Sequence, residues 1–103
     1  MVTKSVSEVW TQALAAVADA EVIYVDIDVD VCDRAEVPGC PAAAPGGISA
    51  DELRQFAFLA GATAKVNCID ITEIDATADS EDQRTVRLAA LLILEASAGL
   101  AKR

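Results

Sequence analysis

Hydrophobic residues along this chain follow helical spacing in some segments and form short apolar runs in others, which predicts helices separated by strands. In the first segment Val6, Trp10 and Val17 belong to an i, i+3, i+4, i+7 pattern, and Ser5 with Glu8 forms a capping box. Two β-branched apolar runs have the composition of buried parallel strands. The expected elements are a helix at about 6–18, a strand at 22–27, a loop at 28–48, a helix at 50–60, a strand at 65–71 and a helix at 81–100.

Two further capping-box patterns mark the expected starts of the later helices. They are Ser49 with Glu52 and Ser80 with Gln83, and Gly61 is expected to end the middle helix. The loop that follows the first strand holds all three prolines of the chain, so regular structure is not expected there. We expect a long, ordered loop.

The order helix, strand, helix, strand, helix predicts an α/β fold. Its strands should be parallel and joined by a right-handed crossover, in a three-layer α/β/α arrangement. Two parallel strands make a poor free-standing sheet, and the last helix is apolar on most sides and needs further cover. We therefore expect residues 1–103 to be either the C-terminal part of a larger domain or the subunit of a homo-oligomer.

The charge and composition exclude several classes of protein. The net charge is −9, from 8 Lys and Arg against 17 Asp and Glu, which argues against nucleic acid and anionic membranes as partners. The longest strongly apolar run, Leu88 to Leu94, is far shorter than the roughly 20 residues of a membrane-spanning helix. Three cysteines without a C-x-x-C pair, and no signal peptide, predict reduced thiols and a cytoplasmic protein. The chain has no histidine.

A cluster of aspartates follows the first predicted strand. Asp26, Asp28 and Asp30 alternate, so strand geometry would direct all three carboxylates to one side, with Asp33 close behind. Clustered carboxylates raise one another's pKa unless a cation neutralises them, and hard divalent ions such as Mg²⁺ or Mn²⁺ suit such ligands. The carboxyl ends of parallel strands are where α/β proteins bind ligands. The simpler alternative is a solvated acidic turn.

A second enzyme class is compatible with the same strand. The D-x-D of Asp26 and Asp28 after an apolar strand resembles the motif of haloacid-dehalogenase-like phosphatases. By that resemblance Asp26 would be the nucleophile and Asp28 the acid/base, with Asp75 and Asp79 as a distal metal-binding pair. A D-x-D motif alone is weak evidence, so the following loop has to decide.

That loop resembles the ureohydrolase family, which comprises the arginase, agmatinase and formimidoylglutamase enzymes. VIYVDIDVDVCDRAEVPG at 22–39 is similar to the family's apolar strand with S-x-D-x-D-x-x-D-P and a later P-G, and CPAAAPGGIS at 40–49 to its G-T-P-x-x-G-G-[LI]-[ST]. The resemblance implies that Asp28 and Asp30 bind a binuclear Mn²⁺ centre, with Asp26 and Asp33 in support. CIDITE at 68–73 resembles the strand ending D-[IF]-x-E, so Glu73 would hold the cationic C–N group of a small amidine or guanidine substrate.

Departures from the family pattern limit what this chain can do. Asp26 stands where Ser is common, and Arg34 stands where Pro is usual and could meet a substrate carboxylate. The amino-acid sequence of the loop is most similar to those of formimidoylglutamases. The family's other metal ligands lie in His-containing segments, which a chain without His lacks, so the resemblance covers the last third of such an enzyme. We predict no hydrolase activity from this chain alone, and a non-catalytic, truncated oligomer is the alternative.

Overall fold

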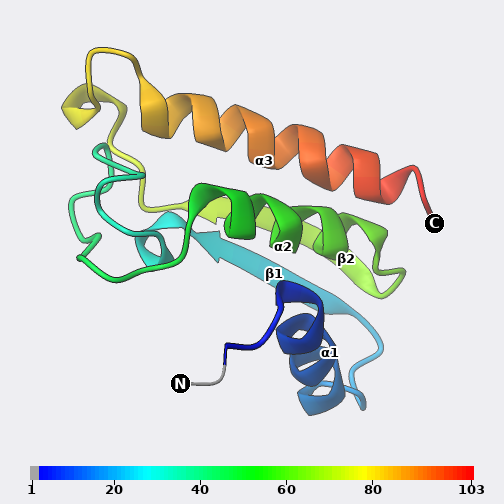
Figure 1. The fold of residues 1–103 in the computed structure, drawn as a ribbon. Helices are drawn as coiled ribbons and strands as arrows, with labels where there is room; N and C mark the ends of the chain where they lie inside the picture. Colours follow the sequence, from blue (N-terminus) through cyan, green and yellow to red (C-terminus); the bar gives the residue numbers. More distant parts are fainter. Residues whose placement is uncertain (1–2) are drawn as a thin grey trace.

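Three α-helices and two parallel strands alternate along the chain in the computed structural model, which describes residues 3–103 (Figure 1). This is the predicted order, and the strands are parallel as predicted. Two short 3-10 turns, η1 and η2, follow the strands and were not predicted. The elements are α1 (Val6–Ala16), β1 (Ile23–Asp28), η1 (Val29–Val31), α2 (Ala50–Ala62), β2 (Val66–Thr72), η2 (Ala76–Ala78) and α3 (Arg84–Leu100).

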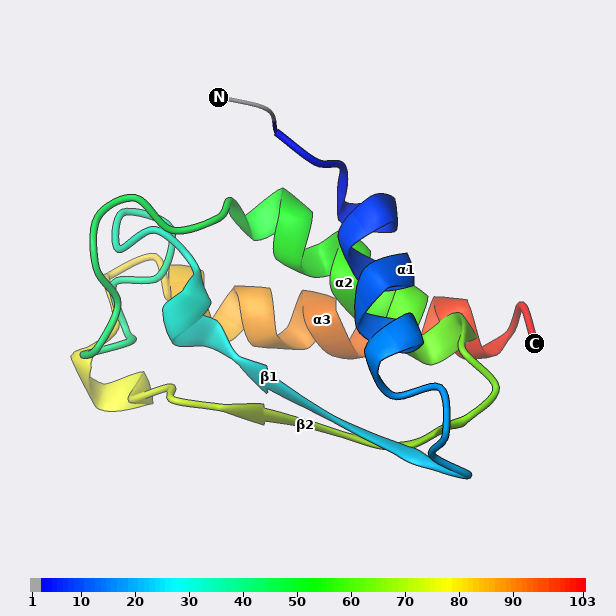
Figure 2. The same cartoon turned by 90° about the horizontal axis from the view of Figure 1, so that it is seen from below.

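All three helices lie on the same side of the sheet, as Figure 2 shows. Ile27 of β1 faces them and is buried, and Ile69 and Ile71 of β2 pack against the same core. The alternate positions Tyr24 and Asp26 point to the opposite face and are exposed. Residues 3–103 therefore contribute the sheet and one helical layer of the predicted α/β/α arrangement.

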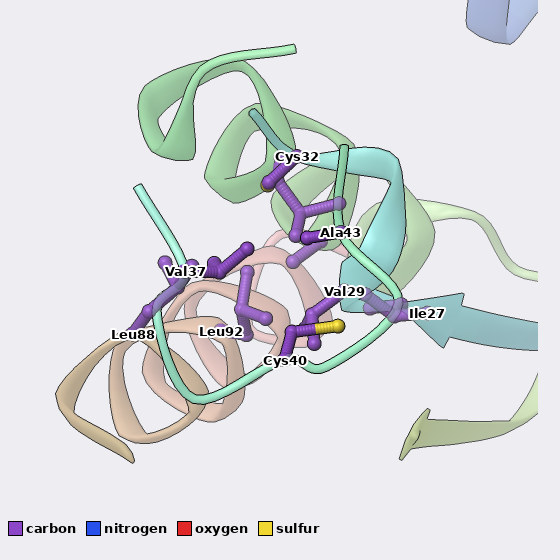
Figure 3. Packing of buried hydrophobic residues seen from close by; sticks show 10 residues of the cluster. Ile27, Val29, Cys32, Val37, Cys40, Ala43, Leu88 and Leu92 are labelled. Carbon is purple, nitrogen blue, oxygen red and sulfur yellow. The ribbon is translucent and has the colours of Figure 1, made fainter. Parts of the chain in front are cut away.

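The long loop after β1 forms much of the core. Val29, Cys32, Val37 and Cys40 are completely buried, and they pack with Leu92 of α3 (Figure 3). The predicted ordered loop is thus confirmed. The segment that follows the carboxyl end of β1 is therefore packed into the core.

The first two capping boxes are present as predicted. In α1 the Glu8 amide donates to Ser5 Oγ at 3.2 Å and the Ser5 amide donates to Glu8 Oε2 at 2.7 Å. Ser49 and Glu52 form the equivalent pair at the start of α2. The predicted end of α2 at Gly61 is wrong, because the helix continues to Ala62 and uses the glycine to approach α3.

The predicted start of α3 at residue 81 is also wrong. The helix begins at Arg84, and Gln83 has a left-handed backbone with φ 54° and provides no side-chain cap. Ser80 donates its hydroxyl to Asp82 instead of capping the helix. The carboxylate of Asp79 takes over the capping function, accepting the amides of Thr85 at 3.2 Å and Val86 at 3.0 Å.

We expect Asp79→Ala to lower the free energy of unfolding by about 1 kcal/mol, as the loss of a helix cap usually does. Partial burial raises the pKa of Asp79, but the hydrogen bonds from Val86 and Thr85 outweigh it and hold this pKa below its ordinary value. A depressed folded pKa stabilises above the unfolded pKa, and this contribution disappears as the pH falls through the folded pKa. Urea unfolding at pH 7 and pH 3 should show a smaller deficit at pH 3 than at pH 7. The exposed Asp82→Ala is the control and should change stability much less than Asp79→Ala.

The remaining boundaries differ from prediction by one or two residues. α1 ends at Ala16 rather than near residue 18, and each strand begins and ends one residue later than expected. Leu94 is 63% exposed and Leu91 37% exposed, which confirms that α3 lacks cover on part of its surface. In the part of the chain that the structure describes, no helix is long and apolar enough to span a membrane.

Candidate active site

The carboxyl end of β1 brings two of the predicted site residues together. Asp28 is the last residue of the strand, and η1 begins immediately after it. The Asp28 carboxylate caps this turn by accepting the Asp30 amide at 3.0 Å. The 3-10 turn therefore brings Asp30 back toward Asp28. Strand alternation was the predicted reason for their proximity, and it was wrong because β1 ends at Asp28, two residues before Asp30.

The two carboxyl groups influence each other electrostatically. Partial burial raises the pKa of Asp30. The negative charge of Asp28 raises this pKa further, as does a hydrogen bond between Asp30 and the carboxyl group of Asp28. Such a pair holds its charge at a cost unless a cation lies between the two groups. The oxygen donors fit a hard divalent metal ion.

Glu73 directly follows the last residue of the neighbouring strand, β2. Asp28 is in register with Thr72, so Glu73 follows the residue directly across from Asp28. Its side chain is exposed, and its backbone has a φ of 71°, which non-glycine residues rarely adopt. Strained backbone of this kind is concentrated at functional sites and turns. The structure thus places Asp28, Asp30 and Glu73 at the carboxyl end of the two-stranded sheet.

Asp26 belongs to a different cluster, on the bare face of the sheet. It is in register with Asp70, and a hydrogen bond between the two carboxyl groups raises the pKa of Asp26, although the Thr72 hydroxyl opposes this by donating at 3.0 Å. The Tyr24 hydroxyl donates a hydrogen bond to Oδ2 of Asp70. Asp70 and Tyr24 were not predicted as members of this cluster, and the strand register pairs Asp70 with Asp26 and Tyr24 with Cys68.

Asp33 and Arg34 organise the loop. Asp33 accepts the amides of Gly46 at 2.9 Å and Ala35 at 3.1 Å, and these bonds hold the pKa of its carboxyl group below the ordinary value. The Arg34 guanidinium donates to three backbone oxygens across the loop. Both side chains therefore make local hydrogen bonds within the loop, and among the described residues neither hydrogen-bonds to Asp28 or Asp30. The three acceptors of Arg34 are the carbonyls of Cys40, Pro41 and Ala43.

The structure does not assemble the phosphatase arrangement. Asp75 caps η2 by accepting the amide and hydroxyl of Thr77, and Asp79 caps α3. Within residues 3–103, no group of three or more acidic or cysteine side chains is placed to hold a metal ion. Asp75 and Asp79 therefore do not meet Asp26 in a metal site.

The amino-acid sequence matches a known protein family over almost the whole chain. The family model described as "Arginase family" matches residues 1–99. The chain belongs to the arginase family. Among its curated relatives, the formimidoylglutamase of Halalkalibacterium halodurans is 46% identical over 74 residues, covering 72% of this chain and 23% of the relative. The formimidoylglutamase of Bacillus subtilis is 40% identical over 78 residues, covering 76% of this chain and 24% of the relative.

Solved structures show the same relationship. The crystal structure of B. subtilis formimidoylglutamase superposes with a TM-score of 0.81 at 37% identity, covering 88% of this chain and 29% of that one. A Trypanosoma cruzi formiminoglutamase structure containing Mn²⁺ gives a TM-score of 0.76 at 31% identity, covering 94% of this chain and 34% of that one. The chain thus spans about a quarter to a third of the length of these relatives. The predicted family and α/β fold are confirmed.

Proposed function

We propose that this chain forms part of the active site of a two-manganese hydrolase that cleaves C–N bonds in linear amidines or guanidines. Asp28 and Asp30 are the metal ligands in this proposal, and Glu73 anchors the substrate. The observation that supports it is that Asp28 and Asp30 adjoin at the end of β1, while Glu73 follows Thr72, the residue of β2 in register with Asp28. Ligands of α/β proteins bind beyond the carboxyl ends of parallel strands, which is where these residues lie.

The residues present suit manganese but cannot complete its site. Asp28 and Asp30 offer hard oxygen donors, which Mn²⁺ accepts. A catalytic metal pair needs further ligands and groups that orient them, and residues 3–103 contain no cluster of three ligating side chains. When bound in a complete site, such a metal pair supplies a water nucleophile that is ionised near neutral pH. We therefore propose that this chain alone is inactive.

Glu73 has the properties of a substrate anchor. Its carboxylate is exposed at the edge of the site, and the left-handed backbone at this residue sets the direction of the side chain independently of strand alternation. A planar amidinium cation can donate two charge-assisted hydrogen bonds to one carboxylate. Glu73 would hold the substrate in this way while Asp28 and Asp30 bind the metals.

The substrate that we favour is formimidoylglutamate. Both curated relatives described above are formimidoylglutamases, and the sequence at 22–49 is similar to the corresponding sequences of that group. Agmatine and arginine are the alternatives within the family. Arg34 does not favour a substrate carboxylate here, because its guanidinium is engaged by the carbonyls of the loop.

The test uses the isolated chain and a chimera in which this chain replaces the segment of B. subtilis formimidoylglutamase to which it aligns. We expect weak or absent Mn²⁺ binding to the isolated chain by calorimetry, with no turnover, and Mn²⁺-dependent hydrolysis of formimidoylglutamate by the chimera. Asp28→Asn with Asp30→Asn should remove any heat that the isolated chain gives. Tight binding of two Mn²⁺ ions with turnover by the isolated chain would contradict a partial site, and a folded, Mn²⁺-loaded but inactive chimera would contradict the proposed reaction.

A further inference from the structure

Thr85, at the start of α3, is the one polar residue with a buried side chain in the part of the chain that the structure describes. Its hydroxyl accepts the Gly39 amide at 2.8 Å. The Thr85 side chain also hydrogen-bonds to the carboxylate of Asp79, which accepts the Thr85 amide at 3.2 Å. A buried N–H that loses its acceptor is costly, so the hydroxyl holds Gly39 firmly against the helix.

Gly39 connects this hydroxyl to the segment that follows β2. Its carbonyl accepts the Asp75 amide at 2.8 Å, so the backbone of one loop residue is bonded to both α3 and Asp75. A Cβ atom at position 39 would lie 2.9 Å from Asp79 Oδ1, which shows how closely the loop passes the cap of α3. The loop, the segment after β2 and the start of α3 lie together at one end of the molecule (Figure 1).

Glu73 lies between two fixed points of the backbone. Thr72 before it is the last residue of β2, and Ile74 after it packs against the core. One residue further on, the Asp75 amide is bonded to Gly39. A left-handed backbone at a glutamate, here with a φ of 71°, persists only where the surrounding structure over-determines it. The bond between Asp75 and Gly39 is one of the contacts that do so.

We propose that Thr85 is a positioning residue for Glu73. Acting through Gly39 and Asp75, its buried hydroxyl fixes the direction from which the Glu73 carboxylate meets the cationic group of the substrate. The inference rests on the proposed function of Glu73 as the substrate anchor. A displacement of about 1 Å in a group that orients a substrate can cost about 100-fold in rate, so a hydroxyl buried behind the site can control activity without contacting the substrate.

The first measurement is amide hydrogen exchange in the isolated chain, without metal or substrate. Thr85→Val keeps the shape of the side chain and removes the hydroxyl. In this variant the Asp75 amide is expected to exchange at least about tenfold faster relative to the amide of the buried Leu92, and Thr85→Ser should restore the exchange rate of the parent. Thr63→Val is the matched control, because it removes a hydroxyl with two hydrogen bonds before the start of β2 and should leave Asp75 unchanged.

The second measurement is the hydrolysis of formimidoylglutamate by the chimera. Thr85→Val is expected to lower kcat/KM by about tenfold or more at unchanged Mn²⁺ content, whereas Thr85→Ser and Thr63→Val should stay within about twofold of the parent. In a chimera that already carries Glu73→Gln, Thr85→Val should change kcat/KM by less than about twofold. A residue that acts through the Glu73 carboxylate has nothing left to position once this carboxylate is gone.

Unchanged exchange of the Asp75 amide in Thr85→Val would overturn the proposal, and so would an equal loss of kcat/KM with and without the Glu73 carboxylate. If Thr85→Val does not fold, Thr85→Ala removes the same hydroxyl with a smaller side chain and gives the same two comparisons. A folded, Mn²⁺-loaded chimera without activity would contradict the proposed reaction. The exchange of the Asp75 amide in the isolated chain would then still decide whether Thr85 holds this segment.

Discussion

Changing Asp28 and Asp30 together to Asn is expected to abolish Mn²⁺-dependent hydrolysis by the chimera with B. subtilis formimidoylglutamase. Asn keeps the size of each side chain and can still cap η1 through its amide oxygen, so the turn from Asp28 to Asp30 should survive. The charge proposed to hold the metals is lost. Removing a residue that merely supports a metal ligand already costs about 10- to 100-fold in affinity or activity, and removing two ligands should cost more.

The control variants for this experiment also separate the two enzyme classes. Asp26→Asn and Asp75→Asn should each leave most of the hydrolysis intact, since Asp26 pairs with Asp70 and Thr72 and Asp75 caps η2. A phosphatase would lose its nucleophile with Asp26→Asn. Full activity in the double variant at Asp28 and Asp30, with Mn²⁺ content unchanged, would rule out their assignment as ligands.

The parts of the fold that follow local rules could be predicted from the sequence. The capping boxes at Ser5 and Ser49 satisfy donors within one helical turn, and β-branched runs in a parallel sheet leave little choice of element. The capping of α3 could not be found in this way. Asp79 reaches the amides of residues six and seven positions later through a turn whose course depends on Gly39 and Thr85, which join the loop to the helix.

The residues of the candidate site could be proposed from the sequence, but their geometry could not be predicted. The order of Asp28, Asp30 and Glu73 along the chain resembles a family pattern, and their assignment to the site rests on that resemblance. Alternation along a strand predicted one common side for the aspartates, yet β1 ends at Asp28 and a 3-10 turn supplies Asp30. The left-handed backbone occurs at a glutamate, not at the glycine or asparagine that usually adopts it, so it could not be predicted from the residue type.

The close approach of α2 and α3 was another feature that the sequence left open, and it leads to the largest expected effect on stability. A Cβ atom at Gly99 would lie 2.1 Å from the Phe58 carbonyl oxygen, and one at Gly61 would lie 2.0 Å from the Ala96 carbonyl oxygen. Both obstructing atoms belong to backbone, so they cannot move without separating the helices. These two glycines fix how closely the helices pack.

Gly99→Ala should therefore lower the free energy of unfolding by about 2 to 3 kcal/mol, as overpacking of a tight contact does. Helix propensity alone predicts the opposite sign, because Ala in a helix is favoured over Gly by about 1 kcal/mol. Urea unfolding followed by circular dichroism measures the difference, with the exposed Ser97→Ala of the same helix as control and an expected change within about 0.5 kcal/mol. A gain in stability for Gly99→Ala would mean that the helices can separate at no cost. Because small domains are only marginally stable, the expected loss would raise the unfolded fraction of the chain more than tenfold, and with it the fraction in which Asp28, Asp30 and Glu73 are not held at the ends of the strands.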